Sequence, residues 1–497
     1  MLSIEKIKNL RSEKIAFFRF KKFDENTYLI TNDIGKYSFL TKEEFSLFIE
    51  GKIESGEKYE ELLKNGFIKK EGFENDMAQA YATKNHFLAY GPSLHIIVTT
   101  LRCNHKCQYC HAAVAPMEAH DMDMTKETAD GVLDTIFHTS SPGITIEFQG
   151  GESLANWEVT KYIVEQAQIR SFHLGKKVFF SLVTNLTLMN EDKLDFLIQN
   201  NISISSSLDG DEEIHNYNRV FLGGNSFEQV TYWIKRINEE YKKRGFDKKM
   251  GALLTVTKKA LPKYKEIIDT YVELGLDSIF IRSLNPYGFA EVDLKNLGYS
   301  SEDFFDFYKN SMEYIIELNK NGVLFCEQLT NIYLAKIFHP KDPNFMDNRS
   351  PCGACIGQVA YNYDGKIYSC DEGRMLGRMG DDNFMMAKLQ ETGSDTYKVM
   401  IESETTKIMV QASTLDGLPG YNENVYKSYI GVCPINSYKV NGSLYPNFMK
   451  DEKRKLDSMI LDFIFGNMRD KEVKKVFENW TNGIKGGLLN GECSNPS

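Results

Sequence analysis

The sequence predicts an α/β protein whose core is a parallel β-sheet. Between residues 94 and 321, short apolar segments of strand length alternate with amphipathic segments of helical period. Six repeated strand and helix units imply parallel strands with reactive groups at their carboxyl ends. The expected strands are Leu94–Thr100, Ile144–Gln149, Val178–Thr184, Ile202–Ser207, Gly251–Val256 and Ser278–Arg282. The expected helices are Lys126–His138, Trp157–Ser171, Glu191–Asn200, Phe227–Arg244, Pro262–Leu274 and Ser301–Asn321.

The length of the chain indicates more than one domain, since 497 residues exceed what one hydrophobic core usually holds. Its net charge of −10, with acidic and basic residues interspersed, argues against nucleic acid as a partner. No apolar run approaches the roughly 18 residues of a membrane helix, and the N-terminus lacks an apolar signal core, so we expect a cytoplasmic protein with no membrane partner. Nine cysteines, an odd number, fit a reducing compartment better than a disulfide framework.

The first 85 residues are expected to form a small separate unit of three strands and two helices. Thr41 and Glu44 have the spacing of a capping box at the first helix. This order of elements resembles the peptide-recognition element of many peptide-modifying enzymes, which binds a leader peptide as an added strand at a sheet edge. A winged-helix cap that only shields the parallel-sheet unit is the alternative. The expected strands are 17–20, 27–31 and 37–40, and the expected helices are 42–50 and 59–64.

Three cysteines, Cys103, Cys107 and Cys110, lie within eight residues directly after the first apolar strand. Thiolates this close can bind one iron-sulfur cubane and leave its fourth iron open to another ligand. A zinc site or a structural ferredoxin-type cluster is the alternative, but zinc sites usually present two ligand pairs and a ferredoxin-type site needs a nearby fourth cysteine. The next cysteine is more than two hundred residues away. With Tyr109 before its last cysteine, the triplet resembles the signature of radical S-adenosylmethionine (SAM) enzymes.

That resemblance implies a partial six-stranded (β/α)6 barrel and a specific chemistry. In the family, the amino and carboxylate groups of SAM chelate the open iron of a [4Fe-4S] cluster. An electron from the cluster cleaves SAM, and the resulting deoxyadenosyl radical takes a hydrogen atom from the substrate. An electron carrier or a scaffold stabilised by clusters is the alternative outside enzymes.

The strand ends after the triplet carry residues that the resemblance assigns to SAM binding. Gly150-Gly151-Glu152 is similar to the family's Gly-Gly-Glu-Pro element, with Ser153 in place of proline. Two glycines let the backbone approach the methionine moiety, and the acid faces its ammonium. Arg219 resembles the arginine that holds the SAM carboxylate. The remaining expected SAM contacts are Tyr109, Thr184, Asn185, Ser205, Ser207 and Asp209.

Four more cysteines follow the barrel segment: Cys352, Cys355, Cys370 and Cys433. The spacing around Asp364-Gly365, where a hairpin should turn, resembles the SPASM/twitch-type extension of radical SAM peptide maturases. A full SPASM pattern would add three cysteines where this chain has Gly420, Glu423 and Tyr429. We therefore expect one auxiliary [4Fe-4S] cluster on these four cysteines, with a tetrahedral zinc site as the alternative. Cys326 is expected in the core and Cys493 in a disordered tail.

The sequence segments around these motifs look most like those of the B-type radical SAM maturase of the His-Xaa-Ser system. The resemblance implies hydrogen abstraction from a side chain of a ribosomally made precursor peptide, followed by cross-linking or oxidation. It also implies an electron donor such as flavodoxin or ferredoxin, and allows a paired second radical SAM protein. Oxidation of a cysteine or serine in a sulfatase-type substrate, or of a small molecule, is the alternative within enzymes. The expected domains are a peptide-recognition unit at 1–85, a radical SAM barrel at 90–320, a SPASM-like auxiliary unit at 321–450 and C-terminal helices with a tail at 451–497.

Asp371 is the expected catalytic acid or base, because it directly follows the cluster ligand Cys370. Loss of an electron from a substrate radical needs a proton acceptor nearby, and a carboxylate whose pKa is raised by burial can serve. Some SPASM maturases place an acid after the matching cysteine and use it as a base. The alternative is structural: Asp371 caps the turn or pairs with Arg374 three residues on.

Overall fold

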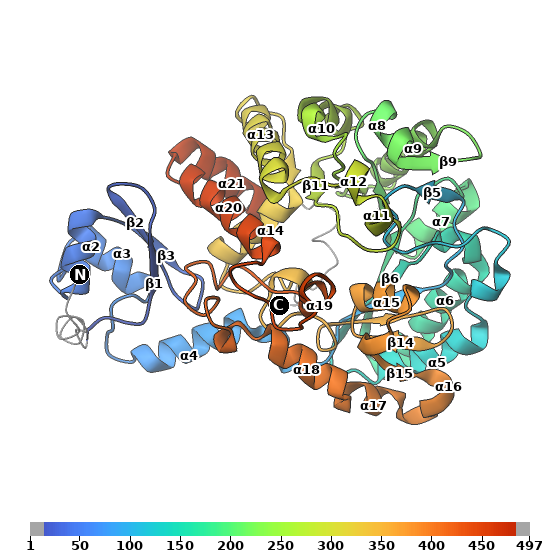
Figure 1. Ribbon diagram of the computed structural model, residues 1–497, viewed down its shortest axis with the longest axis horizontal. Helices are drawn as coiled ribbons and strands as arrows, with labels where there is room; N and C mark the ends of the chain where they lie inside the picture. Colours follow the sequence, from blue (N-terminus) through green and yellow to red (C-terminus); the bar gives the residue numbers. More distant parts are fainter. Residues whose placement is uncertain (1–13, 484–497) are drawn as a thin grey trace.

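The computed structural model describes residues 14–483 and places a ten-stranded sheet at the centre of the protein (Figure 1). Six strands of this sheet pair in parallel in chain order, which confirms the predicted fold class. Their bounds differ from the predicted ones by two residues or fewer at each end. They are β4 (Leu94–Val98), β6 (Gly143–Gln149), β7 (Lys177–Val183), β8 (Ser203–Ser207), β10 (Gly251–Thr255) and β11 (Ser278–Arg282).

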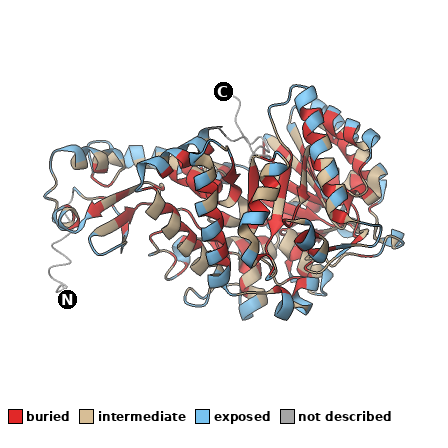
Figure 2. Cartoon of the chain, turned by 90° about the horizontal axis from the view of Figure 1, so that it is seen from above, coloured by how far each residue is buried: buried red, intermediate tan, exposed pale blue. Residues whose placement is uncertain are grey.

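The helices that follow these strands also form where the periodic pattern predicts them. Polar N-caps begin them: Asn190 accepts a hydrogen bond from the backbone of Lys193, and Ser300 forms a capping box with Asp303. Figure 2 shows buried residues along the central strands and exposed ones on the outer faces of the helices. The helices are α5 (Lys126–Phe137), α6 (Trp157–Leu174), α7 (Glu191–Gln199), α9 (Ser226–Lys243), α10 (Tyr264–Glu273) and α13 (Ser301–Lys320).

The sheet continues beyond the six barrel strands at both ends. The short strand β12 (Cys326–Glu327) adds in parallel to β11, and Cys326 is fully buried there, as predicted. At the other end β13 (Gln358–Tyr361) adds in parallel to β4. It turns through Asp364-Gly365 into β14 (Lys366–Tyr368), which pairs with β15 (Met385–Lys388). The hairpin predicted from Asp-Gly is present, and it extends the barrel sheet itself.

The N-terminal elements form a three-stranded antiparallel sheet covered by helices. The predicted capping box is present, since Thr41 Oγ1 accepts from the Glu44 amide at 3.1 Å and Glu44 accepts from the Thr41 amide at 2.8 Å. The first strand begins two residues later than predicted. The elements are β1 (Arg19–Lys22), β2 (Thr27–Thr31), β3 (Tyr37–Thr41), α2 (Lys42–Ile49), α3 (Glu57–Lys64) and α4 (Phe73–Lys84).

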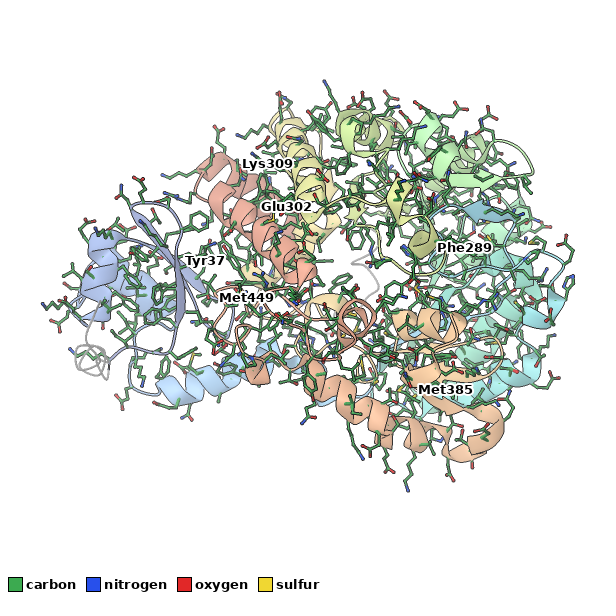
Figure 3. The ribbon with its side chains drawn as sticks, viewed as in Figure 1. Tyr37, Phe289, Glu302, Lys309, Met385 and Met449 are labelled. Carbon is green, nitrogen blue, oxygen red and sulfur yellow. The ribbon has the colours of Figure 1, made fainter. Side chains whose placement is uncertain are left out.

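This N-terminal sheet packs against the C-terminal helices, α20 (Glu452–Asn467) and α21 (Lys471–Gly483). Figure 3 shows Tyr37 on the side of the sheet that faces α20, and its ring lies 5.2 Å from that of Phe465. Asp33 pairs with Arg19 at 2.7 Å and with Lys427 at 3.0 Å. Buried ionic and aromatic contacts therefore hold the unit to the rest of the protein.

The remaining elements are a short strand pair and nine further α-helices among the described residues. Within residues 14–483 no helix is both long and apolar enough to cross a membrane. A two-stranded pair joins β5 (His105–Cys107) to β9 (Arg219–Phe221). The other helices are α8 (Glu212–Asn218), α11 (Phe289–Val292), α12 (Leu294–Leu297), α14 (Gln328–Phe338), α15 (Asp371–Arg378), α16 (Leu389–Thr392), α17 (Thr396–Glu402), α18 (Glu404–Ser413) and α19 (Pro434–Asn441).

Candidate metal centres

The cysteine triplet occupies the loop that leaves the carboxyl end of β4. Its second member, Cys107, lies in β5 and pairs across the short ladder with Arg219 in β9. This pairing brings Arg219 Nη1 to 3.9 Å from the Cys107 sulfur. The Cys103 sulfur accepts from the His105 amide at 3.4 Å and lies 3.8 Å from Asn185 Nδ2. Donors and a cation therefore surround the sulfurs, as negatively charged thiolate ligands require.

Burial raises the pKa of all three thiols. The pKa of the Cys107 thiol is raised to about 12, although the Arg219 charge lowers it. The Cys103 and Cys110 thiols also have pKa values above their usual range, chiefly through burial. Such thiols give up their protons to a metal that compensates the buried charge. The donor set thus fits an iron-sulfur cluster better than a reactive free cysteine.

Gly150 and Gly151 allow the strand end after β6 to touch the cysteine loop. A Cβ on Gly151 would stand 2.3 Å from the Arg102 carbonyl oxygen and 2.5 Å from that of Leu101. At Gly150, where φ is +143°, the same atom would stand 2.3 Å from the Thr100 oxygen. The close approach of two protein segments therefore requires the glycines. This requirement is additional to the predicted approach of the backbone to the methionine moiety.

Glu152 is buried and links the strand ends of β6 and β7. Its carboxylate accepts from Thr184 Oγ1 at 2.7 Å and from the amides of Asn185 at 2.7 Å and Leu154 at 3.0 Å. Burial raises its pKa against the effect of these bonds. Asn185 in turn donates to Asn104 at 2.9 Å. The structure brings Glu152, Thr184 and Asn185, three of the predicted SAM contacts, together beside the cysteine loop.

Asp209 has a different environment from the one expected for a direct SAM contact. Its fully buried carboxylate accepts from Tyr109 Oη at 2.6 Å and from Arg219 Nε at 3.2 Å. Arg219 lies over the Tyr109 ring, 5.4 Å from its centre. Asp209 thus positions both residues beside Cys107.

Two further predicted SAM contacts, Ser205 and Ser207, lie on β8. Both are half-buried and share one face of the strand because they are two residues apart. Ser205 Oγ lies 3.5 Å from the Leu182 carbonyl oxygen in β7, at the limit of a hydrogen bond. Their hydroxyls therefore stand on the barrel strand that precedes Asp209.

Three of the four later cysteines line a second site beside the barrel, and Cys355 is not among its lining residues. Cys370 and Cys433 are the N-cap residues of α15 and α19, and the Cys433 sulfur accepts from the Asn436 amide at 3.4 Å. Cys352, Cys370 and Cys433 line a cavity of about 370 Å³ together with residues 280–287 after β11. Cys355 adjoins Cys352, and its thiol pKa is raised by burial and by the Cys352 charge. It holds φ at +68°, a strained value for a residue with a side chain.

A single zinc ion would need its ligands at about 2.0–2.3 Å from one point. Among residues 14–483 no group of three or more His, Cys, Asp or Glu side chains is close enough for one ion.

Cys493, which was expected in a disordered tail, lies outside the described residues.

Two acids follow Cys370, and they face different surroundings. Asp371 pairs with the buried Arg374 through Nε at 2.9 Å, which is the structural alternative stated for it. It also acts electrostatically on His111 next to the triplet. Glu372, which the sequence argument did not single out, lines the cavity of the later cysteines. Burial and the nearby Asp347 raise the pKa of Glu372 to about 7.

Comparison with known proteins agrees with this geometry. Residues 97–254 match the profile of the radical SAM superfamily. The chain is 28% identical over 283 residues to a cysteine-type anaerobic sulfatase-maturating enzyme of Clostridium perfringens, covering 54% of this chain and 71% of that enzyme. The segment 97–254 that matches the profile contains the triplet, the Gly-Gly-Glu element and Arg219.

Two solved structures share the fold. The first, native anSMEcpe with bound AdoMet, has a TM-score of 0.61 at 20% identity and covers 78% of this chain and 99% of its own. The second, Streptococcus suis SuiB bound to the precursor peptide SuiA, has a TM-score of 0.50 at 14% identity and covers 88% and 99%. Radical SAM enzymes use a [4Fe-4S] cluster and SAM. Residues 97–254 form a radical SAM domain, and the barrel that contains it carries additional units at both ends.

Proposed function

We propose that the protein modifies a side chain of a ribosomally made peptide by radical chemistry. The observation that carries this proposal is the cavity between the end of β11 and the later cysteines. A side chain in that cavity would contact the barrel mouth and the second cysteine site together. SuiB, whose fold covers most of this chain, is described with its precursor peptide bound. Cross-linking or oxidation of the peptide is the expected outcome.

Cys103, Cys107 and Cys110 would hold the cluster that binds SAM, and Cys352, Cys355, Cys370 and Cys433 would hold one auxiliary [4Fe-4S] cluster. The SAM-bound cluster, once reduced, supplies the radical that abstracts hydrogen. The chain's own residues orient the ligand. Arg219, held between Asp209 and the Tyr109 ring, offers its guanidinium to a carboxylate. Glu152, Thr184 and Asn185 fix the neighbouring strand ends.

Asp371 is proposed to accept the proton that a substrate radical loses on oxidation. Asp371 directly follows Cys370 and acts electrostatically on His111, which follows Cys110, and these two relations support the role. The pair with Arg374 fixes the carboxylate in place and keeps one oxygen engaged. The neighbouring Glu372 is the acid that this proposal must be tested against, since it lines the cavity.

The N-terminal sheet is proposed to capture the leader of the peptide at the β1 edge. In the sheet order β1-β2-β3, β1 pairs within the described residues 14–483 with β2 and no other strand. Tyr37 on β3 packs against Phe465, whereas Phe20 on β1 is 53% exposed. Strand addition at such an edge would leave the peptide core free to reach the barrel. Phe20→Glu should weaken peptide binding but spare SAM cleavage, whereas Phe172→Glu, at an 85% exposed site on α6, should change neither.

Oxidation of a cysteine in a sulfatase-type protein is the second candidate. It is favoured by the 28% identity over 283 residues to the cysteine-type sulfatase-maturating enzyme. Such a product is an aldehyde, which hydrazine reagents detect.

Deuterium transfer tests both candidates. The reduced, iron-loaded protein would be incubated with SAM and side-chain-deuterated peptides, one set encoded by short reading frames beside the gene and one from a cysteine-type sulfatase. The proposal predicts that deuterium moves from the precursor peptide to deoxyadenosine, and that the sulfatase peptide transfers none. Transfer from the sulfatase peptide alone would select the second candidate. Deoxyadenosine without deuterium from either set would contradict both.

A further inference from the structure

Tyr287 presents an unpartnered hydroxyl group to the cavity beside the later cysteines. Its side chain is 1% exposed, and it lines the cavity together with Cys352, Cys370 and Cys433. Its Oη atom is buried and has no hydrogen-bond partner in the part of the chain that the structure describes. Buried hydroxyl groups are normally hydrogen-bonded, because leaving one unpaired costs its full desolvation penalty. The hydroxyl therefore indicates an acceptor that fills this cavity in the working protein.

The backbone around Tyr287 is fixed against the first cysteine site. The Phe289 amide donates to the Cys110 carbonyl oxygen at 2.9 Å. Gly288 has φ at +57°, and a Cβ there would stand 2.4 Å from that same oxygen. The Ala290 amide bonds back to the Tyr287 carbonyl at 3.2 Å. The segment cannot move away from the triplet, so the direction of the Tyr287 side chain toward the cavity is set in advance.

Four groups that line the cavity with Tyr287 also interact with it electrostatically, and all four are acceptors: Cys433, Glu372, Cys370 and Asp347. A phenol hydroxyl can donate to any of them. Neither Glu372 nor Asp347 receives a hydrogen bond from it. The other two acceptors of this set are the sulfurs of Cys370 and Cys433, which line the same cavity.

We propose that Tyr287 Oη donates a hydrogen bond to a sulfur atom of the auxiliary cluster, at or next to the Cys433 thiolate. This inference rests on the auxiliary cluster of the proposed function. Hydrogen bonds to cluster sulfurs stabilise the more reduced and more negative state, so they raise the reduction potential. Tyr287 is a positioning residue that sets how readily the auxiliary cluster accepts an electron from the substrate radical.

The test isolates the auxiliary cluster in a full-length background with Cys103→Ala, Cys107→Ala and Cys110→Ala. Tyr287→Phe in that background removes only the hydroxyl. It should bind the same amount of iron and show a lower midpoint potential in an EPR redox titration. In ENDOR spectra, it should lack the one proton coupling that the parent protein shows in H2O and loses after transfer to D2O. Tyr299→Phe is the matched control, since Tyr299 lines the same cavity but its hydroxyl already bonds Leu284 N at 2.8 Å and Val256 O at 3.2 Å. Its potential should not change.

An unchanged potential and an unchanged coupling in Tyr287→Phe would overturn the hydrogen bond alone. If that variant fails to take up the cluster, 3,5-difluorotyrosine at position 287 decides instead. Its more acidic phenol is a stronger donor, so the potential should rise, and an unchanged value would overturn the inference. A triple-cysteine background without iron would overturn the auxiliary cluster of the proposed function, and the hydrogen bond with it.

Discussion

Gly151→Ala should disable the first cysteine site by steric displacement. The added Cβ would meet the Arg102 and Leu101 carbonyl oxygens at 2.3 and 2.5 Å. Carbon and oxygen atoms of adjacent segments normally stay about 3.3 Å or more apart, so one segment must move by about 1 Å. Arg102 directly precedes Cys103 and Leu101 directly precedes Arg102, so the shift reaches a cluster ligand. A misplacement of about 1 Å near reacting groups can lower a rate about 100-fold.

The assay is deoxyadenosine formation by the reduced, iron-loaded variant, together with its iron content and the EPR spectrum of the SAM-binding cluster. We expect a loss of about 100-fold in SAM cleavage and an altered spectrum. Gly417→Ala is the control, because a Cβ there meets no atom within 4 Å. Normal cleavage and a normal spectrum in Gly151→Ala would refute the argument from close approach.

Three further predictions concern buried or paired charges. Asp209→Asn leaves buried Arg219 uncompensated, so the free energy of unfolding should fall by about 3–5 kcal/mol in urea titrations; unchanged stability would contradict that pairing. Burial and the Lys336 charge lower the pKa of Lys84 to about 7. From pH 7 to about 10 the folded state therefore binds fewer protons than the unfolded state, so the free energy of unfolding should rise with pH. Lys84→Met should abolish that rise and be more stable at pH 7. Asp371→Asn should retain iron and SAM cleavage but lose peptide product; loss of product only in Glu372→Gln would reassign the base.

The sequence was sufficient for the barrel because its strands and helices follow local patterns. Apolar runs and caps such as Ser300 depend on neighbouring residues in the chain, and the six parallel strands and their helices formed where those patterns place them. The cysteine triplet could be recognised for the same reason, because its three residues lie close together in the chain. Addition of β13 to the edge of β4 was not predicted, because it joins residues more than 250 positions apart. No local pattern encodes such a pairing.

The contacts within the site that the sequence did not predict depend on long-range packing. The ladder of β5 with β9 places Arg219 opposite Cys107, across more than one hundred residues. Asp209 was expected to face SAM, but its fully buried carboxylate holds Tyr109 and Arg219 instead. Tyr287 carried one weak signal in the sequence: the glycine after it, whose left-handed backbone is required by the Cys110 carbonyl. Only the structure shows which segment that glycine touches.

The central claim is that the triplet directs radical cleavage of SAM, and the most direct measurement is deoxyadenosine formation by the anaerobically reconstituted, reduced protein. The account predicts deoxyadenosine and methionine in equal amounts. It also predicts close to eight irons per chain, as expected for two [4Fe-4S] clusters. The variant with Cys103→Ala, Cys107→Ala and Cys110→Ala should retain about half of that iron and cleave no SAM. Absence of deoxyadenosine from the reduced wild type, or equal iron content and cleavage in the triple variant, would contradict the account.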